Sequence, residues 1–274
     1  MRITLLAAVA LATACAKPPP EAPKELGDLS LYLFSHFDDE DPDALIAGLE
    51  ALDLQFQDYE LTGDLSDRSF TMPLLEKGDL GGVSAPPNQP VDEQTPVAVM
   101  GLSRHDLATN RDLIRKSNYV CIESDTTTFY GRDHMDDVGC FASGDCEVTA
   151  TVNEVRKESI LANVWYDLYK DHRNVELTDG RKAVIARSWI EDAFPSDSGK
   201  YSWNQLYTLE IWLASGKQTQ RFHTAWSAVS LGVIGPDVYT NIVGDAIDGG
   251  FTNADHFVDG EDCKNDRERA YDRG

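Results

Sequence analysis

The clearest alternation of apolar and polar residues along the chain lies between positions 201 and 213. One set of alternate positions is apolar and the other is polar: Tyr201, Trp203, Tyr207, Leu209, Ile211 and Leu213 against Ser202, Asn204, Thr208 and Glu210. A period of two predicts a β-strand with one buried face. The same period places Trp203 and Trp212 on opposite faces of the strand, so at least one of these indoles should point away from the main core.

Turn signals join this strand to its neighbours. Ser215-Gly216 leads into a partner strand, Asp179-Gly180 predicts a type I′ hairpin, and residues 195–199 separate the two hairpins. The sequence therefore predicts an antiparallel meander of at least four long strands, at about residues 164–177, 183–193, 201–213 and 219–229.

A helix is predicted after Asp41-Pro42, where a capping carboxylate precedes a proline in the first turn. Its apolar residues recur at steps of four and three and should pack on the protein's own core: Leu45, Leu49, Leu52, Phe56 and Tyr59. Glycines and prolines then concentrate in residues 78–96, interpreted as a loop or linker between a helical N-terminal lobe (26–77) and a main domain (97–274).

The main domain opens with short elements and closes with a helix. Strands are expected at 97–100 and 118–122, with a helix between them that a capping box of Ser103 and Asp106 opens. Gly235-Pro236 begins the last helix and Gly249-Gly250 ends it. The apolar residues of that helix lie on one side: Val238, Ile242, Ala246 and Ile247.

A long antiparallel meander packed against a C-terminal helix defines an α+β fold. This order of elements resembles the START-like helix-grip folds of lipid-binding proteins and the half-barrels of lipoprotein carriers. All five tryptophans (Trp165, Trp189, Trp203, Trp212 and Trp226) lie on the predicted meander. Indoles suit an apolar ligand pocket, but the core of a sheet buries them as readily, so both interpretations stay open.

The acidic composition excludes some partners. The chain has 24 Lys and Arg against 47 Asp and Glu, which gives a formal net charge of −23. Nucleic-acid binding needs clustered cations that displace counterions from phosphates, so no nucleic acid is expected as a partner. A hydrophobic content of 42% is that of an ordinary globular protein.

The N-terminus has the pattern of an export signal. Arg2 precedes an apolar run that is too short to span a bilayer, and small residues follow before Cys15. The stretch LATAC resembles the lipobox of bacterial lipoproteins, although Ala12 stands where that motif most often has leucine. The resemblance implies a signal peptide at residues 1–14 and a lipidated Cys15. The alternative is ordinary cleavage after Ala14, which leaves Cys15 as a free thiol on a secreted protein.

Residues 15–25 combine this cysteine with the proline-rich segment AKPPPEAPKE, an extended spacer that lifts a domain off a membrane. By analogy with enteric lipoproteins, Ala16 after the cysteine implies sorting to the outer membrane of a Gram-negative cell envelope. The lipid bilayer is thus the expected partner of Cys15.

The cysteines support an exported protein. Lipidation of Cys15 leaves an even set of four, which suits two disulfides in an oxidising compartment. Cys140 and Cys146 flank a short turn that a local bridge closes, which leaves Cys121 to pair with Cys263. A metal site is less favoured because the C-x-x-C pairs of zinc thiolate sites are missing.

Candidate chemistry is sparse. Gly101-Leu-Ser103-Arg-His105 is half of a nucleophile elbow, but His105 replaces the second glycine and the meander contradicts an α/β-hydrolase sheet. Ser103 is better explained as a helix cap. The six histidines are scattered, the acidic runs at 38–43 and 255–266 lack calcium-loop spacing, and phosphate-binding loops are missing, so no metal or cofactor is expected.

These observations lead to three hypotheses for an envelope lipoprotein. The first is a non-catalytic module that holds an apolar small ligand between sheet and helix. The second is an interaction protein whose faces contact other envelope proteins. The third is a serine hydrolase that uses Ser103. A cavity lined by Trp and Tyr would favour the first over the second.

Overall fold

A computed structural model describes residues 21–261, except 58, 60, 62, 71, 87–93, 160–161 and 231–234. The predicted signal peptide, Cys15 and Cys263 lie outside the described residues. None of the helices within these ranges is long and apolar enough to cross a membrane.

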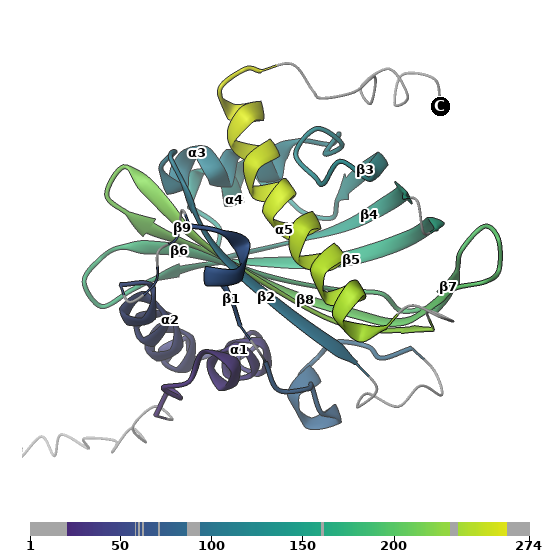
Figure 1. Ribbon diagram of the computed structural model, residues 1–274. Coiled ribbons are helices and arrows are strands. Elements are labelled where there is room, and N and C mark those ends of the chain that lie inside the picture. The colour runs from purple at the N-terminus through teal and green to yellow at the C-terminus, as the bar shows by residue number, and fades with distance from the viewer. Residues whose placement is uncertain are drawn as a thin grey trace, which may run out of the picture.

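A nine-stranded antiparallel sheet forms the body of the protein (Figure 1). Its strands are β1 (Ser69–Phe70), β2 (Thr95–Ser103), β3 (Thr127–His134), β4 (Val148–Glu158), β5 (Asn163–Glu176), β6 (Lys182–Trp189), β7 (Phe194–Pro195), β8 (Ser202–Ser215) and β9 (Gln218–Ser230). Their order is β1-β2-β9-β8-β6-β5-β4-β3, and β7 pairs with β8. The predicted meander is confirmed as β5, β6, β8 and β9.

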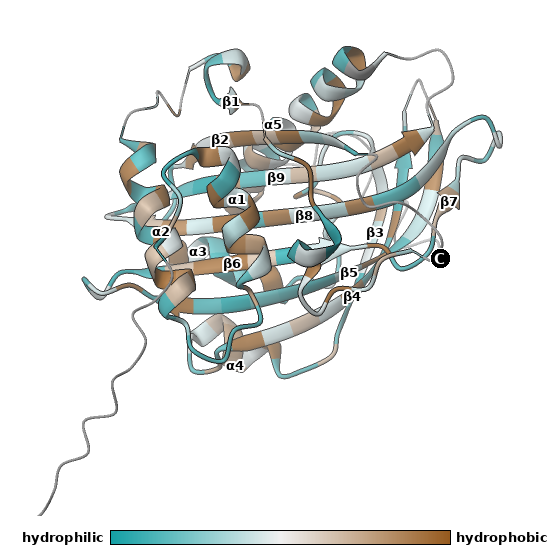
Figure 2. Ribbon diagram, turned by 90° about the horizontal axis from the view of Figure 1, so that it is seen from below, coloured by the Kyte–Doolittle hydropathy of each residue, from teal (hydrophilic) through white to brown (hydrophobic). Residues whose placement is uncertain are grey.

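In the part of the chain that the structure describes, five α-helices accompany the sheet: α1 (Leu26–Ser35), α2 (Asp43–Phe56), α3 (Leu107–Asp112), α4 (Val138–Ser143) and α5 (Pro236–Val258). The helices α1 and α2 cover one face of the sheet, seen from their side in Figure 2, and α5 crosses the other face. We call these the α1–α2 face and the α5 face. The α+β architecture expected from the sequence is confirmed.

The α1–α2 face is a closely packed core. The apolar positions predicted for α2 are fully buried at Leu45, Leu49 and Leu52, and they pack on strand residues such as Leu209 and Ile211. The helical segment and the sheet therefore share one hydrophobic cluster, which confirms the predicted inward face of α2.

The β5–β6 hairpin forms as expected, but its turn differs from the prediction. The amide of Gly180 donates to the carbonyl of Leu177 at 2.9 Å, so Thr178 and Asp179 occupy the centre of the turn. Gly180 follows with φ of 83°, the left-handed conformation that glycine adopts without strain. The predicted type I′ turn centred on Asp179-Gly180 is therefore wrong by one residue.

The last helix does not end at Gly249-Gly250. It runs on to Val258, because Phe251 and Ala254 beyond the glycines pack against the sheet side of the molecule. A glycine inside a helix costs only about 1 kcal/mol relative to alanine, which the burial of these side chains outweighs. The predicted strand at 118–122 is also wrong, since only Asn118 makes a bridge, to Gly131, and the following residues form a buried turn.

Candidate functional site

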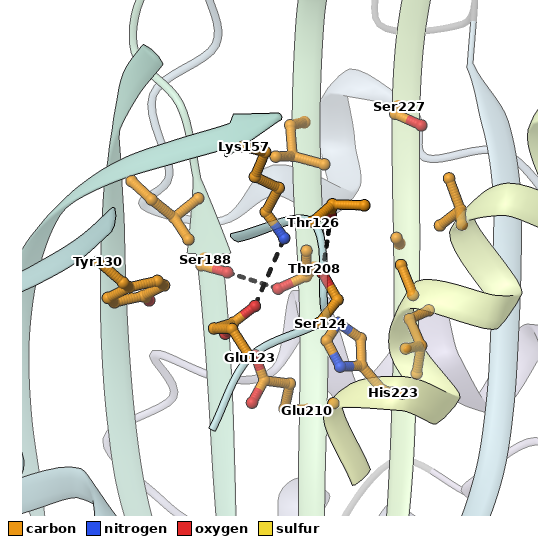
Figure 3. Close-up of a pocket in the computed structure, with 18 of the residues that line it drawn as sticks. Glu123, Ser124, Thr126, Tyr130, Lys157, Ser188, Thr208, Glu210, His223 and Ser227 are labelled. Atoms are coloured by element: carbon orange, nitrogen blue, oxygen red, sulfur yellow. Dashed lines mark hydrogen bonds and ion pairs between the residues drawn. The ribbon is translucent and has the colours of Figure 1, made fainter. Parts of the chain in front are cut away.

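A cavity of about 550 Å³ lies between the α5 face of the sheet and α5 (Figure 3). Its volume falls in the range of about 300–1,000 Å³ that is typical of small-molecule sites. Most of the lining is aliphatic or aromatic: Tyr119, Ile122, Tyr130, Val164, Tyr166, Leu168, Phe194, Trp203, Leu206, Trp212, Ile242, Val243, Ile247 and Phe251. The cavity predicted by the first hypothesis is thus present in the structure.

A β-bulge in β8 decides which aromatic rings reach the cavity. The pairing with β9 shifts between Trp203 and Gln205, so one extra residue inverts the alternation before Gln205. Trp203 consequently lines the cavity together with Trp212. The expectation that these two indoles face opposite ways is wrong, because the period of two holds only where the register is regular.

Three stacked rings form one wall of the cavity. The ring centroids of Tyr166 and Phe194 lie 4.4 Å apart, those of Phe194 and Trp203 lie 5.5 Å apart, and both pairs are within 7° of parallel. The rings come from β5, β7 and β8. Burial raises the pKa of the Tyr166 phenol, so it stays neutral and presents an apolar ring with one polar tip.

The other tryptophans divide between core and surface. Trp226 is fully buried on the α1–α2 face, where its ring meets Phe34 edge-on, and its indole N–H donates to the carbonyl of Pro73 at 3.0 Å. Trp165 lies half-exposed and stacked on Phe129. Both interpretations of the tryptophans therefore hold, each for different residues.

A charged cluster lies on the sheet side of the cavity. Lys170 of β5 donates from Nζ to Glu210 Oε1 of β8, and Glu210 stands directly opposite His223 of β9. Burial disfavours the charge on Glu210, but Lys170 beside it, and then His223, hold its pKa at about 2. Burial lowers the pKa of His223, so this ring is neutral at neutral pH.

A second ion pair lies at the end of the cavity formed by the loop before β3. Lys157 Nζ of β4 lies 3.4 Å from Glu123 Oε2, and both side chains are partly exposed. The hydroxyls of Ser188 and Thr208, which also line the cavity, hydrogen-bond to each other across β6 and β8 (Figure 3). The cavity therefore combines apolar walls with a few converging polar groups.

Sequence reasoning missed the charged cluster. It placed Thr208 and Glu210 on the polar face of a half-buried strand, whereas that face is turned toward the cavity and covered by α5. Lys170 and His223 belong to other strands, and their meeting with Glu210 depends on the strand register. The sequence did contain one signal: each of three predicted strands of the meander has an ionisable residue at a position that alternates onto the same face of the sheet.

Ser103 is not the helix cap that its spacing indicates. It ends β2, fully buried, and its Oγ donates to Asp255 Oδ1 of α5 at 2.6 Å while accepting from Asn110 Nδ2 at 3.2 Å. The cap of α3 is Asp106, whose carboxylate accepts from the amide of Thr109 at 2.9 Å. The strand extends up to Ser103, which turns its hydroxyl toward α5 rather than into the first turn of α3.

The same geometry bears on the hydrolase alternative. A nucleophilic serine needs a neighbouring base and access to substrate. Ser103 is closed off from solvent, and its hydroxyl is engaged by a carboxylate and an amide that belong to a structural junction between β2, α3 and α5. The arrangement does not support Ser103 as a nucleophile.

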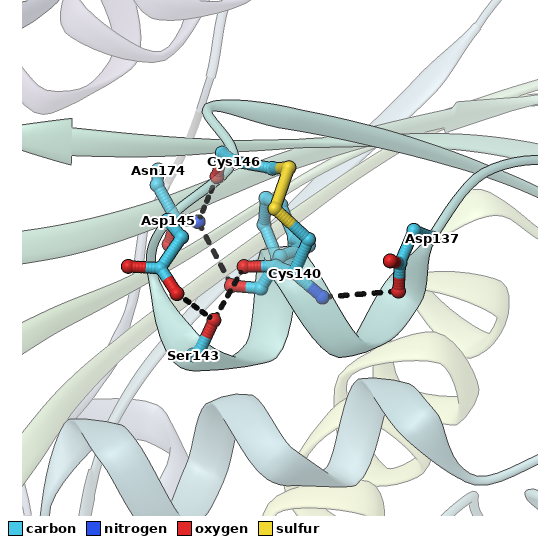
Figure 4. Close-up of a disulfide and its surroundings, with 7 residues drawn as sticks. Asp137, Cys140, Ser143, Asp145, Cys146 and Asn174 are labelled. Carbon is cyan, nitrogen blue, oxygen red and sulfur yellow. Dashed lines mark hydrogen bonds between the residues drawn. A yellow bond between two sulfur atoms is a disulfide. The ribbon is translucent and has the colours of Figure 1, made fainter.

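The predicted disulfide between Cys140 and Cys146 is confirmed, with Cα atoms 5.2 Å apart (Figure 4). It closes the turn after α4, and Asn174 of β5 donates to the carbonyl of Cys146 at 2.8 Å. The pairing of Cys121 with Cys263 stays a prediction, because Cys263 lies outside the described residues.

The acidic run at 38–43 makes structural contacts. Asp38 pairs with the buried Arg187 at 2.6 Å, and Oδ2 of Asp39 accepts from His36 Nδ1 at 2.6 Å. Across the described ranges, no group of three His, Cys, Asp or Glu side chains is placed to hold a metal ion.

Comparisons with known proteins give only distant likenesses. No family model matches the chain, and no curated protein matches it. Among solved structures, the chain is similar to a STAR-related lipid transfer protein from Xanthomonas axonopodis, with 10% identity and a TM-score of 0.44 over 60% of this chain and 85% of the other. The Zhui aromatase/cyclase from Streptomyces sp. R1128 gives 10% identity and a TM-score of 0.39 over 64% and 94%.

Human StAR-related lipid transfer protein 5 gives 8% identity and a TM-score of 0.39 over 60% of this chain and 76% of the other. These structures include START-like proteins, the group that the element order resembles. What this chain's own structure defines is an α+β protein with a mainly apolar cavity between a sheet and its last helix.

Proposed function

We propose that this protein binds an apolar small molecule in the cavity beneath α5. The observation that carries the proposal is the cavity itself, about 550 Å³ in volume, lined mainly by aliphatic and aromatic side chains with a few converging polar groups. A concave apolar site of this kind is the usual form of a small-molecule site.

The difference in packing between the two faces of the sheet supports this proposal. Side chains that border a void lose dispersion contacts on one side, which lowers stability. The α1–α2 face of the same sheet shows that this chain packs tightly where it has two covering helices. A ligand beneath α5 would supply such contacts on the other face, so the protein should become more stable when the ligand binds.

Binding can be tested with N-phenyl-1-naphthylamine, a neutral apolar fluorophore, on the full chain carrying Cys15→Ser, which removes the predicted lipid acceptor. We expect saturable binding with quenching of tryptophan emission, because Trp203 and Trp212 both line the cavity. The variant Ala225→Phe projects a ring into the cavity from β9 and should abolish binding.

The matched control is Ala47→Phe on α2, which adds the same ring on the far side of the sheet and should bind the probe normally. Failure of the probe to bind the parent chain, or equal binding to Ala225→Phe, would contradict the proposed function.

We further propose that Cys15 carries a lipid that anchors the protein in the cell envelope, at the outer membrane. The proposal rests on the LATAC sequence and the proline-rich spacer. Fatty-acid labelling and membrane association of the natural chain should both be lost in Cys15→Ser. Membrane association without any acyl label on the natural chain would contradict lipidation.

A further inference from the structure

The charges around the cavity are balanced in pairs. Among the residues that the structure places on its lining, three are cations: Lys157, Lys170 and Arg221. Each has a carboxylate partner, respectively Glu123 at 3.4 Å, Glu210, and Asp255 at 2.8 Å. Within this described lining, no cation is left over to neutralise an anionic ligand.

Two further carboxylates, Asp125 and Asp245, also line the cavity, and the whole chain carries a formal charge of −23. An anionic ligand would approach against this charge and then bury its own charge without a counterion. Like charges brought together in a desolvated site repel each other strongly, so the cavity disfavours carboxylates and phosphates.

The Lys170–Glu210 pair is a buried ion pair on the cavity wall. The side chains of Lys170 and Glu210 are only 6% and 16% exposed, and the ammonium binds one carboxylate oxygen, Oε1. The other oxygen, Oε2, has no hydrogen-bond partner in the part of the chain that the structure describes. A carboxylate oxygen that borders a cavity and has no protein donor favours any ligand group that can supply one.

His223 on the neighbouring strand is paired directly with Glu210. Its ring nitrogens have no hydrogen-bond partner among the described residues, and the side chain borders the cavity. A neutral imidazole offers one donor and one acceptor, so together with Glu210 Oε2 it can hold a group that both donates and accepts. A hydroxyl is the smallest group that does both.

We propose that the ligand is an amphiphile with an uncharged hydroxyl at its polar end, which donates to Glu210 Oε2 while its apolar chain lies along the aromatic wall. This inference rests on the proposed binding function. A cationic amine fits less well, because Lys170 already neutralises Glu210 and a second cation would be left unpaired.

The test compares three ligands of equal chain length as competitors of N-phenyl-1-naphthylamine: dodecan-1-ol, its methyl ether and dodecanoate. The ether can accept a hydrogen bond but cannot donate one. We expect the alcohol to bind the parent chain about tenfold more tightly than the ether, since a hydrogen bond to a charged group is lost. Dodecanoate should bind more weakly than either.

Variants of the ion pair should change this order in a defined way. Glu210→Gln leaves the buried ammonium of Lys170 without its carboxylate, so dodecanoate should become the tightest of the three ligands. The double variant Glu210→Gln with Lys170→Met is neutral again, and the advantage of the alcohol over the ether should fall below that of the parent chain, because the glutamine carbonyl accepts a hydrogen bond but carries no charge. Glu147→Gln, which removes the carboxylate partner of the buried Arg173 away from the cavity, should keep the parent order.

Equal binding of alcohol and ether by the parent chain would overturn the inference, as would an unchanged ligand order in Glu210→Gln. Should Glu210→Gln fail to fold, the parent chain and the neutral double variant still decide the matter. Failure of the proposed function is seen separately and earlier, because the fluorophore alone would then bind neither the parent chain nor any variant.

Discussion

The two faces of the central sheet are built by the same strands but packed in opposite ways. On β8, Leu209 and Ile211 point to the α1–α2 face, where they are fully buried among helix side chains. The alternate residues Leu206, Thr208 and Glu210 point to the α5 face and line a cavity. On the α1–α2 face, two helices pack directly on the sheet, whereas on the other face α5 crosses the sheet and leaves a cavity beneath it.

The comparison shows how one sheet can provide stability and a binding site at once. Close packing gives each buried methylene many contacts, so a core face stabilises the fold most per side chain. The cavity face forgoes part of this stabilisation and keeps polar groups that a filled core would exclude. The difference between the faces can be measured by matched substitutions.

The largest difference is expected from truncating leucines on β8. Leu209→Ala should lower the free energy of unfolding by about 2–5 kcal/mol, because it opens a new void in a packed core. Leu206→Ala enlarges a cavity that already exists, so its loss in the free energy of unfolding should be about 1–2 kcal/mol smaller than that of Leu209→Ala. Urea denaturation of both variants checks the prediction, and equal losses would show that the two faces are packed alike.

A smaller difference between the two faces is expected from substitutions that enlarge a side chain. Ala98→Leu on β2 forces extra atoms into the α1–α2 core and should destabilise the protein by about 1–3 kcal/mol. Ala225→Leu on β9 places the same atoms in the cavity, where they find room and should leave stability unchanged or slightly higher. A large loss of thermal stability in Ala225→Leu would mean that the cavity is not open at this point.

The covering helices offer a third matched pair. A Cβ on Gly48 of α2 would lie 2.6 Å from Leu33 Cδ2, a fully buried atom, so Gly48→Ala should destabilise the protein by about 1 kcal/mol or more. A Cβ on Gly249 of α5 meets nothing within 4 Å. Gly249→Ala should therefore stabilise the helix by about 0.5–1 kcal/mol, measured as a rise in the melting temperature.

The smallest effect is a change in how stability depends on pH. Burial lowers the pKa of His223 and lowers that of His172 well below its ordinary value, and Lys170 nearby adds to both shifts. The unfolded chain then takes up protons first as the pH falls below about 6.5, so stability should decrease there.

His172→Phe should flatten this decrease between pH 7 and pH 5 in urea titrations. Thr224→Val, which alters a buried polar side chain that does not titrate, should leave the slope unchanged. A parent chain whose stability is constant over this range would contradict the prediction.

Local patterns in the sequence predicted the regular elements well. The leucine spacing of α2 and the alternation of β8 reflect side chains that repeat on one face, and both elements are present with the expected buried residues. These features depend on neighbours within the same segment, which a sequence displays directly.

Features that depend on distant partners were missed. The bulge at Trp203–Gln205 is a property of the pairing of β8 with β9, and no residue within β8 marks it. The role of Ser103 depends on Asp255, which lies far away in sequence on α5. The Lys170–Glu210–His223 cluster likewise exists only through the register of several strands, so the site was predicted as a pocket but not as a set of residues.

The position of α5 in the chain has a consequence for the order in which the protein is made. The helix follows β9 directly in sequence order, and it is the element that closes the cavity. A chain that emerges N-terminus first, at synthesis or at export, can complete the sheet and its α1–α2 face before the cover exists. During that interval the future cavity is an open trough, so a ligand can be bound before the last helix docks over it.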